Sequence, residues 1–126
     1  MKQLTKSMFI LLFAVACGNA QTQNEAAQDV SVTKFKELIE KGTGLLLDVR
    51  TPEEFEEGYI EGAKNINYYD DDFDAQIEKL DKDKPVLVYC GSGGRSAKTM
   101  SLMKEKGFKE VYNLLGGYGA WVSQKW

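Results

Sequence analysis

The sequence predicts an α/β domain in which a mostly parallel central sheet is covered by helices on both faces. Strand-like and helix-like segments alternate along residues 30–126, and this alternation is typical of parallel sheets. Residues 45–49 form an apolar run that is interrupted by one acid, Asp48, and residues 86–89 form a second apolar run, as in strands buried on both faces. A chain of 126 residues holds one such domain at most.

The domain opens with a helix followed by a buried strand. Thr33 is placed to cap the helix, and Gly42 is placed to end it. One apolar stripe follows the helical period; it consists of Phe35, Leu38 and Ile39. Residues 45–49 then predict the strand.

A second helix has a strong start signal. Thr51 lies at the expected N-cap, Pro52 at the first helical position, and Glu54 completes a capping box. Gly58 ends this helix, and residues 65–67 predict a short strand.

The second half repeats the alternation. Residues 70–72 are three aspartates, which the macrodipole favours at a helix N-terminus. Residues 86–89 predict a strand and residues 96–106 a helix. Residues 110–114 predict the last strand, and a short helix with Trp121 follows.

Residues 1–20 have the layout of an export signal. Lys2 and Lys6 precede the apolar run 8–16, and small residues follow at 17–20. A transmembrane anchor is the alternative, but it needs about 20 apolar residues. The expectation is therefore a signal peptide over 1–20, a polar tether over 21–29, and a folded domain over 30–126.

Two cleavage sites compete in this signal. Residues 18–20 fit cleavage before Gln21. Residues 14–17 resemble the lipobox of bacterial lipoproteins, although Ala14 stands where leucine is usual. In the second case Cys17 is lipidated and tethers the chain to a membrane. Either site predicts an exported, periplasmic protein.

Charge and residue types exclude several functions. Lys2 and Lys6 are two of the 16 basic residues, so the exported chain keeps 14 against 19 acidic ones, a net charge of −5. This balance argues against nucleic-acid binding. The absence of histidine excludes Ser-His-Asp and Cys-His catalysis and leaves no plausible zinc cluster. No metal or organic cofactor is expected.

Cys90 is the candidate nucleophile. It ends the second buried strand and precedes a turn that is rich in glycine. Gly91, Gly93 and Gly94 permit positive φ, so backbone N–H groups can converge on the sulfur. The next helix adds its positive end, which would lower the thiol pKa without a base. A flexible hairpin has similar glycines but need not join a strand to a helix.

Four motifs, in order and at their spacing, resemble the single-domain rhodaneses, a sulfurtransferase family. They are residues 46–55, residues 58–66, the turn 90–96, and Gly116-Gly117 before Trp121. The resemblance covers about residues 30–126 and implies a three-layer fold with about five strands. Tyr59 departs from it, because many relatives have histidine there. This position is expected to be a packing contact.

The resemblance implies that Cys90 carries sulfur as a persulfide. The loop residues implied in substrate binding are Gly91, Ser92, Gly93, Gly94, Arg95 and Ser96. Arg95 would bind the oxygens of the donor or compensate the thiolate. Asp48 lies in an otherwise apolar strand and is expected to pair with a basic residue or a backbone amide. Arg50 is expected to be either that partner or a rim residue near the donor, and both residues are expected to support the site. The implied donor is a small anion such as thiosulfate or a persulfide, and the acceptor is cyanide or a thiol.

Two other functions remain open at this stage. Rhodanese-like domains also occur as inactive modules or as carriers that receive sulfur from a protein. Cdc25-like phosphatases and arsenate reductases place five residues between cysteine and arginine, commonly with a histidine before the cysteine. Here four residues separate Cys90 from Arg95, and Tyr89 precedes. The shorter turn suits a single sulfur atom better than a phosphate.

Overall fold

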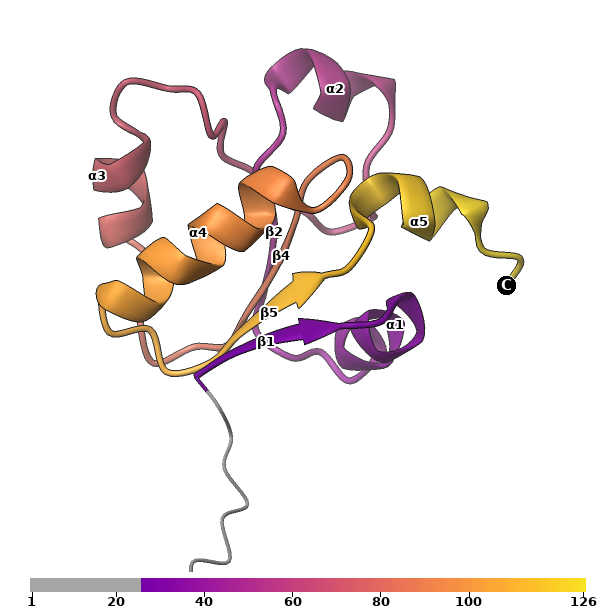
Figure 1. The fold of residues 1–126 in the computed structure, drawn as a ribbon, viewed down its shortest axis with the longest axis horizontal. Helices are drawn as coiled ribbons and strands as arrows, with labels where there is room; N and C mark the ends of the chain where they lie inside the picture. The colour runs from indigo at the N-terminus through magenta and orange to yellow at the C-terminus, as the bar shows by residue number, and fades with distance from the viewer. Residues whose placement is uncertain (1–25) are drawn as a thin grey trace, which may run out of the picture.

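Five parallel strands form the centre of the molecule in the computed structural model, which describes residues 26–126 (Figure 1). The strands are β1 (Ala27–Val30), β2 (Leu45–Asp48), β3 (Lys64–Asn65), β4 (Val86–Tyr89) and β5 (Val111–Leu114). Their order in the sheet is β1-β5-β4-β2-β3, and every pairing is parallel. The predicted α/β fold with a parallel sheet is confirmed, and β4 lies at its centre.

Helices cover both faces of this sheet. They are α1 (Val32–Glu40), α2 (Pro52–Glu57), α3 (Phe73–Glu78), α4 (Gly94–Glu105) and α5 (Gly117–Ser123). One apolar cluster joins α3 and α4 to the sheet, and a second joins α1 and α5 to the opposite face. Helix α2 lies beyond the carboxyl end of β2 (Figure 1). The fold is therefore three layers, with α2 beside the edge where the strands end.

The folded part begins earlier than the sequence predicts. Residues 27–29 were expected to belong to a polar tether, but they form β1 together with Val30. This strand pairs only with β5 and lies at the edge of the sheet. An edge strand is only partly buried, so it lacks the apolar run that marks a central strand.

The start of α1 also differs from the prediction. The N-cap is Ser31, whose Oγ accepts a hydrogen bond of 3.2 Å from the N–H of Lys34. Thr33 lies inside the helix, so its assignment as the cap is wrong. Both residue types favour caps, and Ser31 is the one that directly follows β1.

The capping box of α2 is confirmed. Thr51 Oγ1 accepts from the N–H of Glu54, and the Glu54 carboxylate accepts from the N–H of Thr51. Gly58 is the C-cap, as predicted. Helix α4 begins at Gly94 rather than at Ser96. Gly94 and Arg95 of the predicted turn therefore belong to the helix, and Gly93 is its N-cap.

The predicted signal peptide, its cleavage sites and the lipidation of Cys17 lie outside the described residues. Within residues 26–126, no helix combines the length and the apolar character that crossing a membrane requires.

Candidate active site around Cys90

Cys90 lies where the central strand ends. It follows β4 directly, and the turn 91–93 connects it to α4. Ligands of open parallel sheets bind beyond the carboxyl ends of the strands. The first turn of α4 also provides N–H groups that have no partner within the helix. Cys90 is thus at the edge where such a fold carries its chemistry.

The Cys90 sulfur is surrounded by hydrogen-bond donors. The N–H of Gly93 donates to Sγ over 3.1 Å. The hydroxyl oxygen of Ser96 lies 3.3 Å from Sγ and 3.2 Å from the carbonyl oxygen of Gly93, so one proton serves two acceptors. The expected approach of backbone N–H groups to the sulfur is seen at Gly93.

These donors lower the pKa of Cys90. Burial acts in the opposite direction and is the largest single influence, because it disfavours the charged thiolate. The hydroxyl and backbone N–H of Ser96, with the N–H groups of Gly93 and Ser92, outweigh it. The net direction is therefore towards a thiolate, without a histidine or another base.

The three glycines of the turn play different roles. Only Gly93 has a positive φ, at 113°. Gly91 instead provides space, because a Cβ there would lie 3.3 Å from Arg95 Nη2 and 3.5 Å from Glu54 Oε2. Gly94 is an ordinary helical residue with open space around its Cα. Of the three glycines that permit positive φ, only Gly93 adopts it.

The first residues of α5 bind the backbone carbonyls of the Cys90 loop. The N–H of Tyr118 donates to the carbonyl oxygen of Cys90 over 2.7 Å, and the N–H of Gly119 to that of Gly91 over 3.0 Å. Gly117 fits against these two carbonyls, since a Cβ there would lie 2.5 Å from the Cys90 oxygen. Sequence reasoning missed these contacts, although Gly116-Gly117 marked the start of the helix.

Glu54 is a site residue that the sequence analysis placed only in the capping box. Its carboxylate accepts two hydrogen bonds from Arg95, Nη1–Oε1 at 2.8 Å and Nη2–Oε2 at 3.0 Å. Arg95 was expected to bind the donor or to compensate the thiolate. It lies beside the loop, but its terminal nitrogens face a carboxylate. No local signal links two residues that are 41 positions apart.

Asp48 and Arg50 form a buried ion pair beneath the site. Arg50 donates to both carboxylate oxygens through Nε at 3.1 Å and through Nη2 at 2.7 Å. Its Nη2 also donates to the carbonyl of Gly58, and its guanidinium stacks 4.3 Å from the Tyr118 ring. The expected pairing of the buried acid with Arg50 is present. The pair links β2 to α5, and hence to the loop.

Tyr59 packs against α2. Its ring stacks on Phe55 with centroids 4.1 Å apart, and half of the residue is exposed. The packing contact expected for Tyr59 is therefore made with the side chain of Phe55 in α2.

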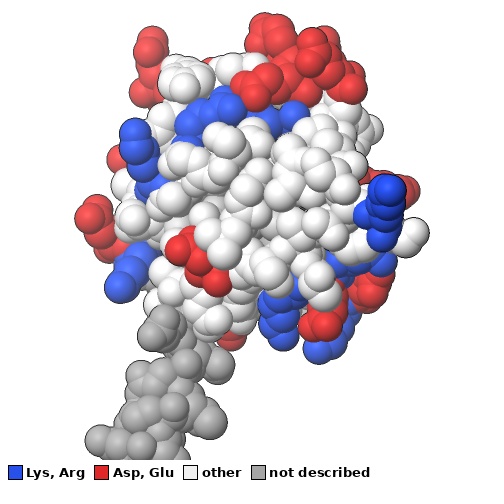
Figure 2. Space-filling model, turned by 45° about the vertical axis from the view of Figure 1, so that its right-hand side comes forward, with Lys and Arg blue, Asp and Glu red and all other residues white. Residues whose placement is uncertain are grey.

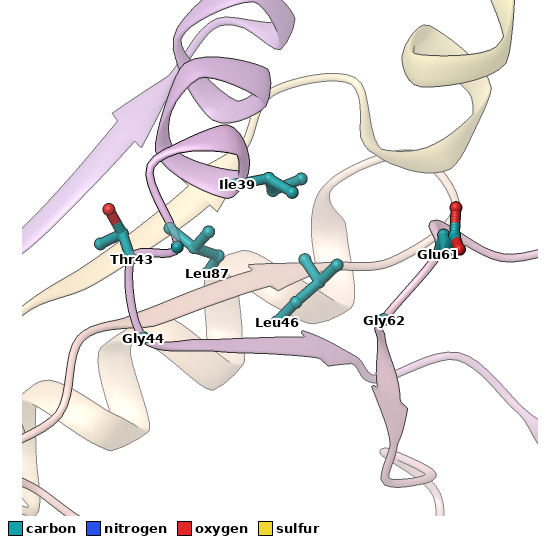
Figure 3. Close-up of a pocket in the computed structure, with 8 residues that line it drawn as sticks. Ile39, Thr43, Gly44, Leu46, Glu61, Gly62 and Leu87 are labelled. Atoms are coloured by element: carbon teal, nitrogen blue, oxygen red, sulfur yellow. The ribbon is translucent and has the colours of Figure 1, made fainter.

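Cys90 is covered in this conformation, with 1% of its surface exposed. A cavity of about 160 Å³ lies elsewhere, beside α1, with the side chains of Ile39, Leu46 and Leu87 around it (Figure 3). Leu46 and Leu87 face α1, whereas Cys90 belongs to the cluster on the opposite face. This cavity is separate from the thiol.

The fold and the site define a class of protein: a parallel α/β domain that stabilises a cysteine thiolate with main-chain N–H groups at the end of its central strand. Comparisons with known proteins agree. The family model described as a rhodanese-like domain matches residues 31–124. The chain is 40% identical over 94 residues to the thiosulfate sulfurtransferase GlpE of Coxiella burnetii, covering 75% of this chain and 86% of that protein.

Two further comparisons extend this result. The chain is 36% identical to the chloroplastic thiosulfate sulfurtransferase 16 of Arabidopsis thaliana, covering 79% of this chain and 91% of that one. The crystal structure of a rhodanese-like domain protein from Staphylococcus aureus superposes with a TM-score of 0.66 at 28% identity, covering 75% and 90% of the two chains. The chain belongs to the rhodanese family and is a rhodanese-type transferase.

Proposed function

We propose that this protein is a sulfurtransferase that carries sulfane sulfur on Cys90 as a persulfide. The observation that carries the proposal is the pair of hydrogen-bond donors at Sγ, the N–H of Gly93 at 3.1 Å and the hydroxyl of Ser96 at 3.3 Å. A persulfide is an anion like the thiolate, so the same donors would stabilise both forms.

The proposed cycle has two half-reactions. The Cys90 thiolate attacks the outer sulfur of thiosulfate, a new S–S bond forms, and the bond to the sulfonate sulfur breaks to release sulfite. Cyanide or a thiolate then attacks the outer sulfur of the persulfide and leaves with it. Cyanide gives thiocyanate, and a thiolate gives a new persulfide. The Cys90 thiolate is regenerated with its charge unchanged.

The geometry favours this chemistry over phosphate chemistry. Four residues separate Cys90 from Arg95, and both terminal nitrogens of Arg95 are bound to Glu54. A phosphate ester needs donors for three oxygens, whereas a persulfide presents one terminal sulfur. The relatives named for thiosulfate sulfurtransfer support the same choice. A carrier that receives sulfur from a protein persulfide would use the same cysteine.

We also propose that the protein is exported. The order of basic, apolar and small residues over 1–20 supports this, and Cys17 in the lipobox-like segment supports a membrane tether.

The test is thiosulfate:cyanide transfer by the purified protein, with the mass added to Cys90 identified after incubation with thiosulfate alone. We expect thiocyanate formation and one added sulfur atom on Cys90. Cys90→Ser should abolish both. Cys17→Ser makes the same atomic change at the other cysteine of the chain and should retain both. Turnover in Cys90→Ser would refute the persulfide mechanism, and sulfur loading without turnover would identify a carrier.

A further inference from the structure

The ion pair between Glu54 and Arg95 lies directly against the residue that follows the nucleophile. A Cβ at Gly91 would lie 3.3 Å from Arg95 Nη2 and 3.5 Å from Glu54 Oε2. Both charged groups therefore lie beside the backbone of the Cys90 loop. The pair is partly buried, with 20% of the Arg95 side chain and 37% of the Glu54 side chain exposed.

Glu54 is fixed from both sides. Arg95 donates to its two oxygens, and the N–H and hydroxyl of Thr51 donate to Oε1 at 3.3 and 3.1 Å. The hydrogen bond from Arg95, followed by those from Thr51, lowers the pKa of Glu54 to about 2 despite its partial burial. The carboxylate is therefore ionised at neutral pH.

This carboxylate neutralises the cation of the loop. Arg95 is the arginine expected to attract an anionic donor, yet its charge is balanced by Glu54. Helix α2 adds the exposed carboxylates of Glu53, Glu56 and Glu57. Figure 2 shows acidic side chains gathered at the end of the molecule where α2 lies in Figure 1. Negative charge at this end of the molecule opposes a dianion more than a singly charged ion, because the Coulomb energy is proportional to the charge of the ion.

We infer that Glu54 is a specificity-determining residue that sets the charge preference of the Cys90 site, favouring singly charged over doubly charged sulfur donors. This inference rests on the proposed sulfurtransferase function. Glu54 acts through Arg95: while the pair is formed, Arg95 offers little net attraction to a dianion. When the negative charge of Glu54 is removed, the attraction of Arg95 for anions is no longer balanced. The gain in attraction is proportional to the charge of the anion.

Glu54→Gln is the matched variant. Glutamine also completes a capping box and keeps an oxygen for Arg95, so α2 and the position of Arg95 are retained while one charge is lost. Glu56→Gln removes the same charge from an exposed position of the same helix and controls for net charge. Thiosulfate is the dianionic donor. Benzenethiosulfonate is the monoanionic donor, which transfers the same outer sulfur and releases a sulfinate.

The expected result is a change in donor preference. In Glu54→Gln, kcat/KM should rise about tenfold for thiosulfate and about threefold for benzenethiosulfonate, mainly through KM. Their ratio therefore rises about threefold, while Glu56→Gln leaves it near the wild-type value. An unchanged ratio in Glu54→Gln overturns the inference. A loss of kcat with both donors at unchanged KM also overturns it, because Glu54 would then only position Arg95.

A second measurement separates this inference from the proposed function. The alkylation rates of Cys90 by iodoacetate, an anion, and by iodoacetamide, which is neutral, are followed on the Cys90 peptide by mass spectrometry. Any change in thiolate fraction cancels in their ratio. We expect the iodoacetate-to-iodoacetamide ratio to rise about threefold in Glu54→Gln, and no rise overturns the inference. If the wild type transfers sulfur from neither donor, the proposed function fails, and the alkylation ratio still decides the role of Glu54.

Discussion

The backbone N–H of Tyr118 donates a hydrogen bond of 2.7 Å to the carbonyl oxygen of Cys90. The N–H of Gly119 binds the next carbonyl, that of Gly91, at 3.0 Å. In a trans peptide the C=O and N–H groups point in opposite directions. Carbonyls that are held towards α5 therefore direct the N–H groups of Gly91 and Ser92 away from it, and the N–H of Ser92 is among the groups that lower the pKa of Cys90. Helix α5 thus orients the peptides that stabilise the thiolate.

Gly117→Ala should slow sulfur transfer strongly while it reduces the stability of the fold only modestly. The new Cβ would lie 2.5 Å from the Cys90 oxygen and 2.7 Å from the Gly91 oxygen, at a φ of 59°. We expect about 1–2 kcal/mol of backbone strain and a shift of the loop that slows sulfur transfer at least about tenfold. The alkylation midpoint of Cys90 should move to higher pH, because the N–H groups of the loop would no longer be oriented towards the sulfur. Chemical denaturation, transfer assays and alkylation rates measure the three effects.

Gly107→Ala is the matched control for this variant. Gly107 has a φ of 91° and no atom within 4 Å of the added Cβ, and it lies at the far end of α4. It should cost similar stability while leaving transfer and alkylation unchanged. If Gly117→Ala keeps the wild-type alkylation midpoint, α5 does not orient the loop.

Ser96→Ala should raise the pKa of Cys90. The hydroxyl of Ser96 is the strongest of the groups that lower this pKa, and its oxygen lies 3.3 Å from Sγ. The wild-type thiol should alkylate with a midpoint below the free-thiol value of about 8.5. The thiolate is the deprotonated form, so a higher pKa leaves less of it at neutral pH, and alkylation and transfer should both fall by a factor of about three to ten. The alkylation rate of Cys90 as a function of pH measures this change. An unchanged midpoint would show that the Ser96 hydroxyl does not lower the pKa of Cys90.

The parts of the molecule that have local signals could be predicted from the sequence. The central strands β2 and β4 are apolar runs, because both of their faces are buried. The start of α2 follows from a threonine, a proline and a glutamate within four positions. The placement of Cys90 follows from the order of strand, glycine turn and helix.

The parts that depend on distant residues could not be predicted in this way. Strand β1 is polar because it lies at an edge, and only its pairing with β5 identifies it. The bond between Glu54 and Arg95 joins α2 to the Cys90 loop across 41 positions. The contact of α5 with the carbonyl of Cys90 likewise requires the folded sheet. Each of these features is a tertiary contact without a periodic or local pattern.

Asp48→Asn should destabilise the protein strongly. Asp48 is fully buried and Arg50 is 4% exposed, so the change leaves an uncompensated buried guanidinium. We expect a loss of about 3 kcal/mol in the free energy of unfolding, measured by urea denaturation. Transfer should also slow, since Arg50 packs on Tyr118, whose N–H holds the Cys90 carbonyl.

Asp83→Asn breaks an ion pair with Lys109 in which both side chains are at least 70% exposed, and it should cost less than about 1 kcal/mol. Equal losses in the two variants would mean that the buried pair contributes no more than a surface one, and that Arg50 finds other partners when the carboxylate is removed.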